Sequence, residues 1–111
     1  MEIKDLRREI DEVDDELLML LNRRAALALE IGKLKRVANL PLLDPSRERY
    51  VIERACRSNR GPFDTPAVTR LFRSIIDECC GAVAPIFGPN DSEMKSGASV
   101  KERARDAEAG L

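Results

Sequence analysis

The sequence contains no histidine and no tryptophan. Without an imidazole the chain cannot form the Ser-His or Cys-His pairs of nucleophilic enzymes, and most zinc sites are excluded as well. Its three cysteines, Cys56, Cys79 and Cys80, are an odd number with two adjacent members, which does not indicate a disulfide framework. We expect that Cys79 and Cys80 do not both face inward, and we expect no metal and no cofactor.

Long hydrophobic runs and a strong net charge are also absent. No apolar stretch approaches about 18 residues, so we expect no membrane span. Residues 1–16 are charged and lack the apolar core of a signal peptide, which favours a cytoplasmic location. The net charge of −1 creates no field for nucleic acid, and no stacking aromatics accompany the basic residues. Any anion site must therefore be built from local cations.

What the sequence does contain is helical patterning. Apolar residues recur at helical spacing over residues 3–38, with no proline before Pro41. At 1.5 Å per residue this helix would be about 54 Å long, whereas a compact 100-residue globule has a radius of gyration of only about 13 Å. The chain offers no second helix of matching length for the apolar stripe.

Two shorter helices follow. Asp44 before Pro45, and Thr65 before Pro66, are typical of an N-cap followed by proline at the first helical position. These signals and the apolar spacing predict helices over residues 45–58 and 66–83. The predicted fold is therefore all-α, with one long, one short and one medium helix.

Proline and glycine end this pattern near Pro85. Residues 1–84 are therefore expected to form one domain. Residues 85–111 are polar and rich in small side chains, and we expect a mobile tail that carries at most a weak helix over 99–108.

The apolar stripe of the long helix favours a homodimer in which two long helices pair. Charge suits an antiparallel pairing, because residues 2–16 hold eight acids and three bases, whereas residues 17–36 hold five bases and one acid. The same asymmetry also suits the helix dipole without any partner. Both interpretations remain open.

Two cations of the long helix point into its apolar stripe. On a helical wheel Arg24 shares the direction of Leu6, and Lys35 lies three turns later with only about 20° of rotation. Buried cations need partners, so a small anion held between them is one interpretation. Pairing with carboxylates of a partner helix, or extension to the edge of the stripe, is the alternative. Arg7 alone is expected at the surface, although an antiparallel partner would bring it towards Arg24.

Other polar positions have both a functional and a structural interpretation. Asp44 fits a plain N-cap, and Arg47 and Glu48 fit either the edge of a site or a solvated first turn. Cys79 and Val83 lie on the inner stripe of the third helix, where core packing is the simpler explanation.

Three segments together resemble the all-helical, type II chorismate mutase family. They read LRREIDEVDDELLMLLNRRAALALEIGKLK, LLDPSRERYVIERA and GPFDTPAVTRLFRSII, and the resemblance covers residues 4–83. It implies an intertwined helical dimer with two equivalent pockets, which converts chorismate to prephenate for phenylalanine and tyrosine synthesis. The GPF stretch is similar to mutase domains fused to aromatic-pathway synthases, but here we expect a mutase that stands alone.

The resemblance also implies roles for the cations. Arg7 would come from the other subunit and grip a substrate carboxylate together with Arg24. Lys35 would hydrogen-bond the ether oxygen. The implied reaction is pericyclic, with the C–O ether bond breaking while a C–C bond forms, and it requires neither a nucleophile nor a proton transfer.

In the second helix, the resemblance implies that Arg47 lies near the ring carboxylate. Asp44, largely through its backbone, and Glu48 would take the substrate hydroxyl. The third helix departs from the family pattern. Cys79 stands where some members have serine, and Val83 stands where members usually have a glutamine or glutamate that donates to the ether oxygen. Another group substitutes for this donor, or the helix is shifted, or activity is low.

Two other functions remain open. An isochorismate-pyruvate lyase uses a similar fold and a related pericyclic step. A non-catalytic helical dimer, which binds or regulates a partner, would explain the loss of a donor at Val83.

Overall fold

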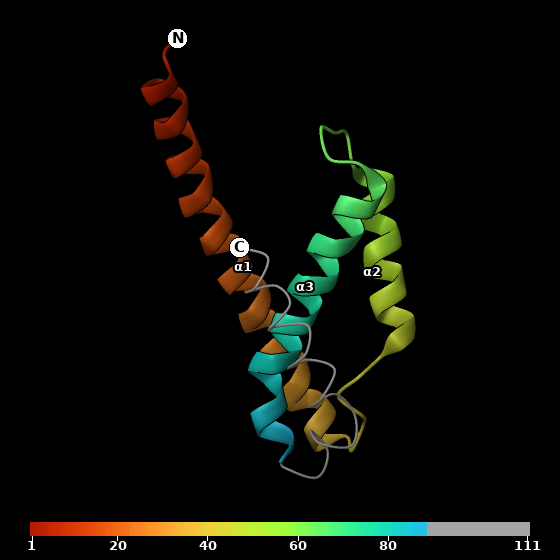
Figure 1. The fold of residues 1–111 in the computed structure, drawn as a ribbon. Helices are drawn as coiled ribbons and strands as arrows, with labels where there is room; N and C mark the ends of the chain where they lie inside the picture. Colours follow the sequence, from red (N-terminus) through yellow and green to blue (C-terminus); the bar gives the residue numbers. More distant parts are fainter. Residues whose placement is uncertain (89–111) are drawn as a thin grey trace.

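The computed structural model describes residues 1–88. In this part of the chain three α-helices and one 3-10 helix are present and no strand is found, which confirms the predicted all-α class (Figure 1). The elements are α1 (Ile3–Val37), α2 (Pro45–Ser58), α3 (Thr65–Val83) and the 3-10 helix η1 (Ala84–Phe87). They differ from the predicted bounds by one residue at the end of α1 and one at the start of α3.

The long helix α1 sets the dimensions of the molecule. Its 35 residues account for the longest extent of 54 Å. α3 packs against both α1 and α2, whereas α1 and α2 make no backbone approach to each other within residues 1–88. In Figure 1 the N-terminal half of α1 diverges from α3 and projects away from the other helices. α3 is therefore the element that holds the other two helices together.

Aspartate side chains begin the two shorter helices. Asp44 caps α2 as predicted, and its Oδ1 accepts a hydrogen bond from the Arg47 backbone N–H at 3.1 Å. The cap of α3 is Asp64, whose Oδ1 accepts from the Ala67 N–H at 2.9 Å. The prediction of Thr65 as the cap is wrong by one residue, because the preceding carboxylate already reaches the free amide of the first turn.

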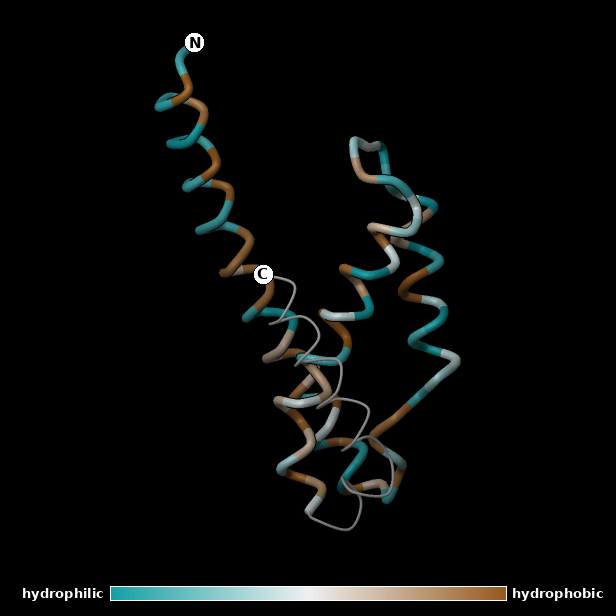
Figure 2. Tube along the Cα trace, viewed as in Figure 1, coloured by the Kyte–Doolittle hydropathy of each residue, from teal (hydrophilic) through white to brown (hydrophobic). Residues whose placement is uncertain are grey.

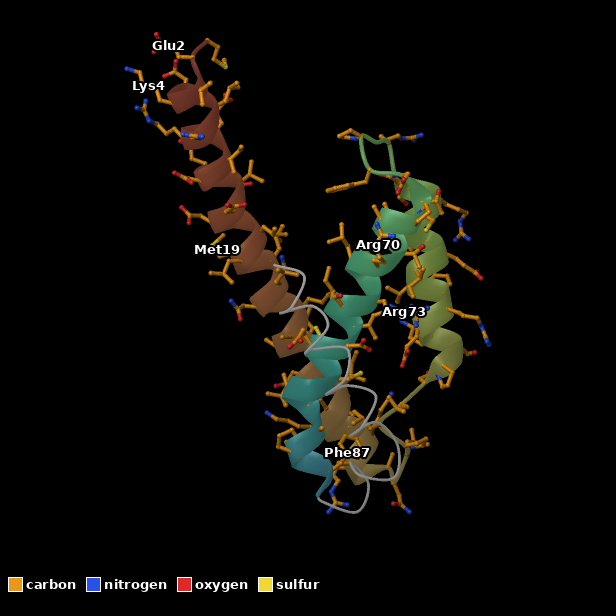
Figure 3. The ribbon with its side chains drawn as sticks, viewed as in Figure 1. Glu2, Lys4, Met19, Arg70, Arg73 and Phe87 are labelled. Carbon is orange, nitrogen blue, oxygen red and sulfur yellow. The ribbon has the colours of Figure 1, made fainter. Side chains whose placement is uncertain are left out.

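The packed core joins the C-terminal half of α1 to the end of α3. Leu42, Val83 and Phe87 form its buried cluster, and Figure 3 labels Phe87 beside this end of α1. Gly32 is the buried residue of α1. A Cβ at this position would overlap Val83 Cγ1 and come within 3.3 Å of Ile86 Cδ1. The missing side chain thus lets α3 approach α1 closely.

The packed region extends to Phe87, which is only 4% exposed. η1 carries the chain from α3 back against α1. Packing therefore continues beyond Pro85, where the predicted tail begins. The remainder of the predicted tail, including the weak helix over 99–108, lies outside the described residues.

The N-terminal half of α1 has an apolar face without a partner in residues 1–88. Leu6, Ile10, Val13 and Leu17 are between 48% and 60% exposed, and Figure 2 shows hydrophobic positions recurring along this half of the helix. Contiguous apolar surface of this kind indicates an interaction site. The pairing of two copies stays a prediction at this point.

The close approach of α1 and α3 leads to a prediction for Gly32→Ala. Overpacking a tight contact costs about 1–3 kcal/mol, which outweighs the gain of roughly 1 kcal/mol in helix propensity. We therefore expect a lower Tm in thermal unfolding followed by circular dichroism. The double variant Gly32→Ala/Val83→Ala has room for the new methyl group, so the two effects should not add. An unchanged or higher Tm for Gly32→Ala alone would contradict the close contact.

Candidate functional site

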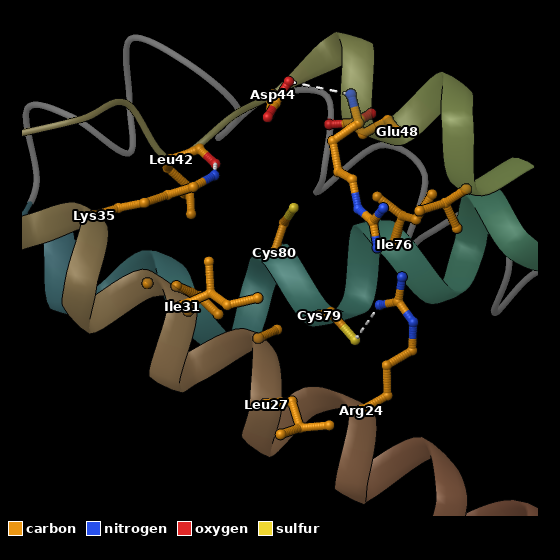
Figure 4. A pocket seen from close by; sticks show the side chains of 15 residues that line it. Arg24, Leu27, Ile31, Lys35, Leu42, Asp44, Glu48, Ile76, Cys79 and Cys80 are labelled. Atoms are coloured by element: carbon orange, nitrogen blue, oxygen red, sulfur yellow. Dashed lines mark hydrogen bonds between the residues drawn. The ribbon is translucent and has the colours of Figure 1, made fainter.

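A cavity of about 340 Å³ lies between the C-terminal half of α1, the start of α2 and the C-terminal half of α3 (Figure 4). This volume is within the range of small-molecule pockets. It opens where α1 and α2 diverge on either side of α3. Its lining consists of Arg24, Leu27, Ala28, Ile31, Gly32, Lys35, Leu42, Asp44, Arg47, Glu48, Val51, Ile76, Cys79, Cys80 and Val83.

Most of the residues that the sequence singled out come together here. Seven of them line the cavity, namely Arg24, Lys35, Asp44, Arg47, Glu48, Cys79 and Val83. Arg7 does not, because it is exposed on the projecting half of α1, about 25 Å along the helix axis from Arg24. Within one chain, Arg7 is therefore separate from the cavity.

The two cations of α1 face the cavity, and no carboxylate of residues 1–88 neutralises their charge. Arg24 is partly buried, and its Nη1 donates to Cys79 Sγ at 3.1 Å. Lys35 is partly buried as well, and its Nζ donates to the Leu42 carbonyl oxygen at 3.1 Å. Neither forms an ion pair with a carboxylate of residues 1–88. Both side chains therefore keep further N–H donors for a ligand.

The first turn of α2 supplies the opposite wall. Asp44 caps the helix, as predicted, and it also lines the cavity. Glu48 is partly buried and Arg47 is exposed, with its guanidinium 5.1 Å from the ring centroid of Tyr50. Both line the cavity, so this turn is more than a solvated helix start.

The charges of the lining residues do not cancel. Three cationic side chains, Arg24, Lys35 and Arg47, face two carboxylates, Asp44 and Glu48. The cavity therefore carries an excess of one positive charge at neutral pH. Because most of its remaining lining is apolar, this charge acts on a ligand with less screening than it would in open water. The arrangement suits an anion.

Both adjacent cysteines line the cavity, so the prediction that only one of them faces inward is wrong. Neighbouring residues of a helix are separated by about 100°, and the cavity wall spans that angle. Figure 4 shows Cys79 directed towards Arg24, and Cys80 directed towards the side of the cavity where Lys35 and Glu48 lie. Burial raises the pKa of the Cys80 thiol above its ordinary value, and the Glu48 carboxylate raises it further.

Val83 has a packing role at the end of the cavity. It is 3% exposed and belongs to the buried cluster with Leu42 and Phe87. Cys79, four residues earlier on the same helix, contacts Arg24, and both Cys79 and Val83 lie on the cavity wall. The position expected to hold a donor is thus occupied by an apolar side chain.

Sequence reasoning missed the apolar walls and Cys80 as parts of the site. Leu27, Ala28 and Ile31 lie on the predicted stripe between the two cations, and this position was a usable signal. Leu42 comes from a loop, where no periodicity indicates which way a side chain or carbonyl points. Cys80 falls outside the predicted inner stripe of α3, because that stripe covers only one face of the helix.

Two features are absent from the part of the chain that the structure describes. Residues 1–88 contain no group of three or more His, Cys, Asp or Glu residues that could hold a metal ion. They also contain no helix with both the length and the apolar character needed to cross a bilayer.

Comparison with known proteins identifies relatives for most of this chain. Residues 6–82 match the family described as chorismate mutase type II. The bifunctional chorismate mutase/prephenate dehydratase of Aquifex aeolicus is 46% identical over 82 residues, which cover 70% of this chain and 23% of that protein. The counterpart from Neisseria gonorrhoeae is 40% identical over 80 residues, with 72% and 22% covered. The chain thus spans about a quarter of the length of these relatives.

A solved structure has the same fold as most of this chain. The chorismate mutase (form I) of Thermus thermophilus has a TM-score of 0.68 and 38% sequence identity with this chain. The alignment covers 69% of this chain and 96% of that one. The likeness therefore extends over essentially the whole of that shorter protein.

The cap of α2 can be tested against the cap of α3. Removing an N-cap carboxylate costs about 1 kcal/mol, whereas asparagine is an equally good cap. We expect Asp44→Ala to lower the free energy of unfolding in urea by about this amount, and Asp44→Asn to leave it nearly unchanged. Asp64→Ala and Asp64→Asn form the matched pair outside the cavity. Equal stability of the alanine and asparagine variants at position 44 would show that Asp44 does not stabilise the helix.

Proposed function

Since this chain belongs to the type II chorismate mutase family, we propose that its cavity binds chorismate and rearranges it to prephenate. The observation that carries the proposal is the position of Arg24 and Lys35, partly buried in one cavity without carboxylate partners in residues 1–88. In the reaction the C–O ether bond breaks as a C–C bond forms within the same molecule. No imidazole, nucleophile or cofactor is needed, which suits a chain without histidine.

The charge of the substrate supports a pocket shared between two copies. Chorismate carries two carboxylates, whereas the cavity of one chain has an excess of one positive charge. Arg7 from a second copy would raise the excess to two and match the dianion. This match is the reason to assign Arg7 to the pocket although its own chain holds it far away.

The surface of α1 supports the same dimer. Its N-terminal half exposes an apolar face and carries eight acids within residues 2–16. An antiparallel second copy would cover this face and set the acidic half beside the basic half. The long helices would then bring Arg7 to the partner's cavity. We therefore propose a homodimer with two equivalent pockets.

The arginines are proposed to act by fixing the shape of the substrate. The planar guanidinium group grips a carboxylate with two parallel hydrogen bonds. Arg24 and the partner's Arg7 would hold the carboxylate of the flexible arm, and Arg47 the carboxylate of the ring. Holding the arm over the ring lowers the entropic part of the barrier, which contributes several kcal/mol in favourable cases.

Lys35 is proposed to act on the bond that breaks. Negative charge develops on the ether oxygen in the transition state, and an ammonium group already in place stabilises it. The Leu42 carbonyl fixes the position of this ammonium group. The buried apolar side chains of Leu42 and Val83 limit water at this end of the cavity. The interaction is strongest in the transition state, so it accelerates the chemical step.

The remaining residues have supporting roles in this proposal. Asp44 and Glu48 lie on the wall where they would take the ring hydroxyl of the substrate. Cys79 orients Arg24 through its sulfur. The prephenate dehydratase named in the Aquifex and Neisseria relatives would use the product of this reaction, which supports a place in phenylalanine synthesis.

The proposal predicts the effect of removing each cation. We expect Arg24→Ala and Lys35→Ala to lower kcat/KM for chorismate by a factor of about 10² or more, since each removes a charged donor from the transition state. Loss of chorismate absorbance in the ultraviolet measures the rate, with isochorismate as a second substrate in parallel. Arg23→Ala and Lys33→Ala are the matched controls on the same helix, because neither residue lines the cavity. Near-wild-type turnover with Arg24→Ala or Lys35→Ala would refute the mutase assignment.

The shared pocket predicts complementation between defective subunits. Arg7→Ala and Lys35→Ala homodimers each have two defective pockets, but a heterodimer concentrates both defects in one pocket and leaves the other intact. Statistical mixing after unfolding and refolding should restore about one quarter of wild-type activity. Mixing Arg24→Ala with Lys35→Ala is the control, because both residues come from one chain and no intact pocket can form. Absence of any regain in the first mixture would exclude the shared pocket.

A further inference from the structure

One polar group of the cavity has no role in the mechanism above. The Cys80 thiol lines the cavity and forms no hydrogen bond with residues 1–88. Cys79, its neighbour, already accepts a hydrogen bond from Arg24. Cys56, the third cysteine, lies outside the cavity beside Thr69 Oγ1, at 3.5 Å. Cys80 is therefore the cavity thiol whose sulfur holds no hydrogen bond within residues 1–88, whereas the sulfur of Cys79 is already bonded to Arg24.

Cys80 faces the part of the cavity where the reacting atoms of the substrate would lie in the proposed reaction. Its side chain points from α3 into the cavity, towards the side formed by Lys35 of α1 and Glu48 of α2 (Figure 4). Both charged groups are close enough to act electrostatically on the thiol, as is Asp77 of α3. In the proposed reaction, Lys35 meets the ether oxygen and Glu48 meets the hydroxyl. Cys80 thus faces the region between these two substrate groups.

The same region lacks the donor that the family resemblance leads one to expect at Val83. Cys80 precedes Val83 by three residues, so the two side chains lie on neighbouring parts of one helix face. Val83 cannot take up the role, because its hydrocarbon side chain has no donor, and it packs against Gly32 and the buried cluster.

We propose that the Cys80 thiol contacts the bound substrate and donates an S–H hydrogen bond in place of the donor missing at Val83. This inference rests on the proposed function. A thiol is a weak donor, but it adds no charge. Burial and the Glu48 carboxylate raise the pKa of Cys80, while Lys35 opposes them. At neutral pH the group therefore remains a neutral thiol, whereas a thiolate would repel a dianionic substrate.

Three substitutions separate hydrogen bonding from packing. Cys80→Ser keeps a donor, whereas Cys80→Ala and Cys80→Val remove it and leave different volumes. We expect kcat to fall about tenfold in both apolar variants, which is less than for a strong charged donor, and to stay within about twofold of wild type in Cys80→Ser. The effect should appear in kcat more than in KM, because the interaction serves the transition state. Cys56→Ala is the control thiol outside the cavity.

A hydrogen-bond donor introduced at position 83 tests whether Cys80 replaces the donor that is missing there. In a Val83→Gln background whose circular dichroism spectrum and Tm stay close to those of the wild type, the amide supplies the hydrogen bond from the neighbouring turn. The further change Cys80→Ala should then cost much less than it does in the wild-type chain. Equal losses in the two backgrounds would mean that Cys80 does not replace the donor at position 83.

Ligand protection tests the contact without using turnover. Iodoacetamide alkylates a thiolate, forming a C–S bond with loss of iodide, and fragmentation of the labelled peptide by mass spectrometry distinguishes Cys80 from Cys79. At a pH near 9 we expect saturating prephenate to slow the alkylation of Cys80 and to leave that of Cys56 unchanged.

The outcomes separate the two proposals. Protection of Cys80 by prephenate in a protein without mutase activity would support the contact and overturn the proposed reaction. Mutase activity with unprotected Cys80 and with unchanged kcat in Cys80→Ala would overturn the thiol contact and leave the reaction standing.

Discussion

The contact between α1 and α3 at Gly32 is the constraint on which the site depends. Because Gly32 has no side chain, Val83 can settle against the backbone of α1. This contact fixes α3 beside the half of α1 that carries Arg24 and Lys35, and it brings Cys79 within hydrogen-bond distance of Arg24. α2 packs against α3 with no close backbone approach to α1, and residues of all three helices line the cavity between them.

The same contact accounts for the valine at the end of α3. Its β-branched side chain fills the space opposite Gly32 and offers the cavity no hydrogen-bonding group. Packing and hydrogen bonding thus compete for one position. The cavity retains a surplus of positive charge that an anionic ligand would balance, so ligand binding is expected to stabilise the folded chain as well as to prepare it for reaction.

Much of this arrangement could be predicted from the sequence, and the exceptions have physical reasons. Periodicity gives the direction of a side chain around its own axis, so the helices and the shared face of Arg24 and Lys35 were predictable. It does not give the angle at which helices cross. The inward position of Cys80 and the Leu42 carbonyl bonded to Lys35 depend on that crossing and on a loop. The cap of α3 was misplaced because Asp64 and Thr65 are both capable N-caps.

The projecting half of α1 couples the folding of the protein to its association in the proposed dimer. Its apolar residues Leu6, Ile10, Val13 and Leu17 are between 48% and 60% exposed, so tertiary packing within one chain gives this part of the helix little support. Isolated helices of this length are only marginally stable in water. In the proposed dimer, ordering of this half and association of the two chains would be a single event. Dilution would then weaken the helix and the pocket together.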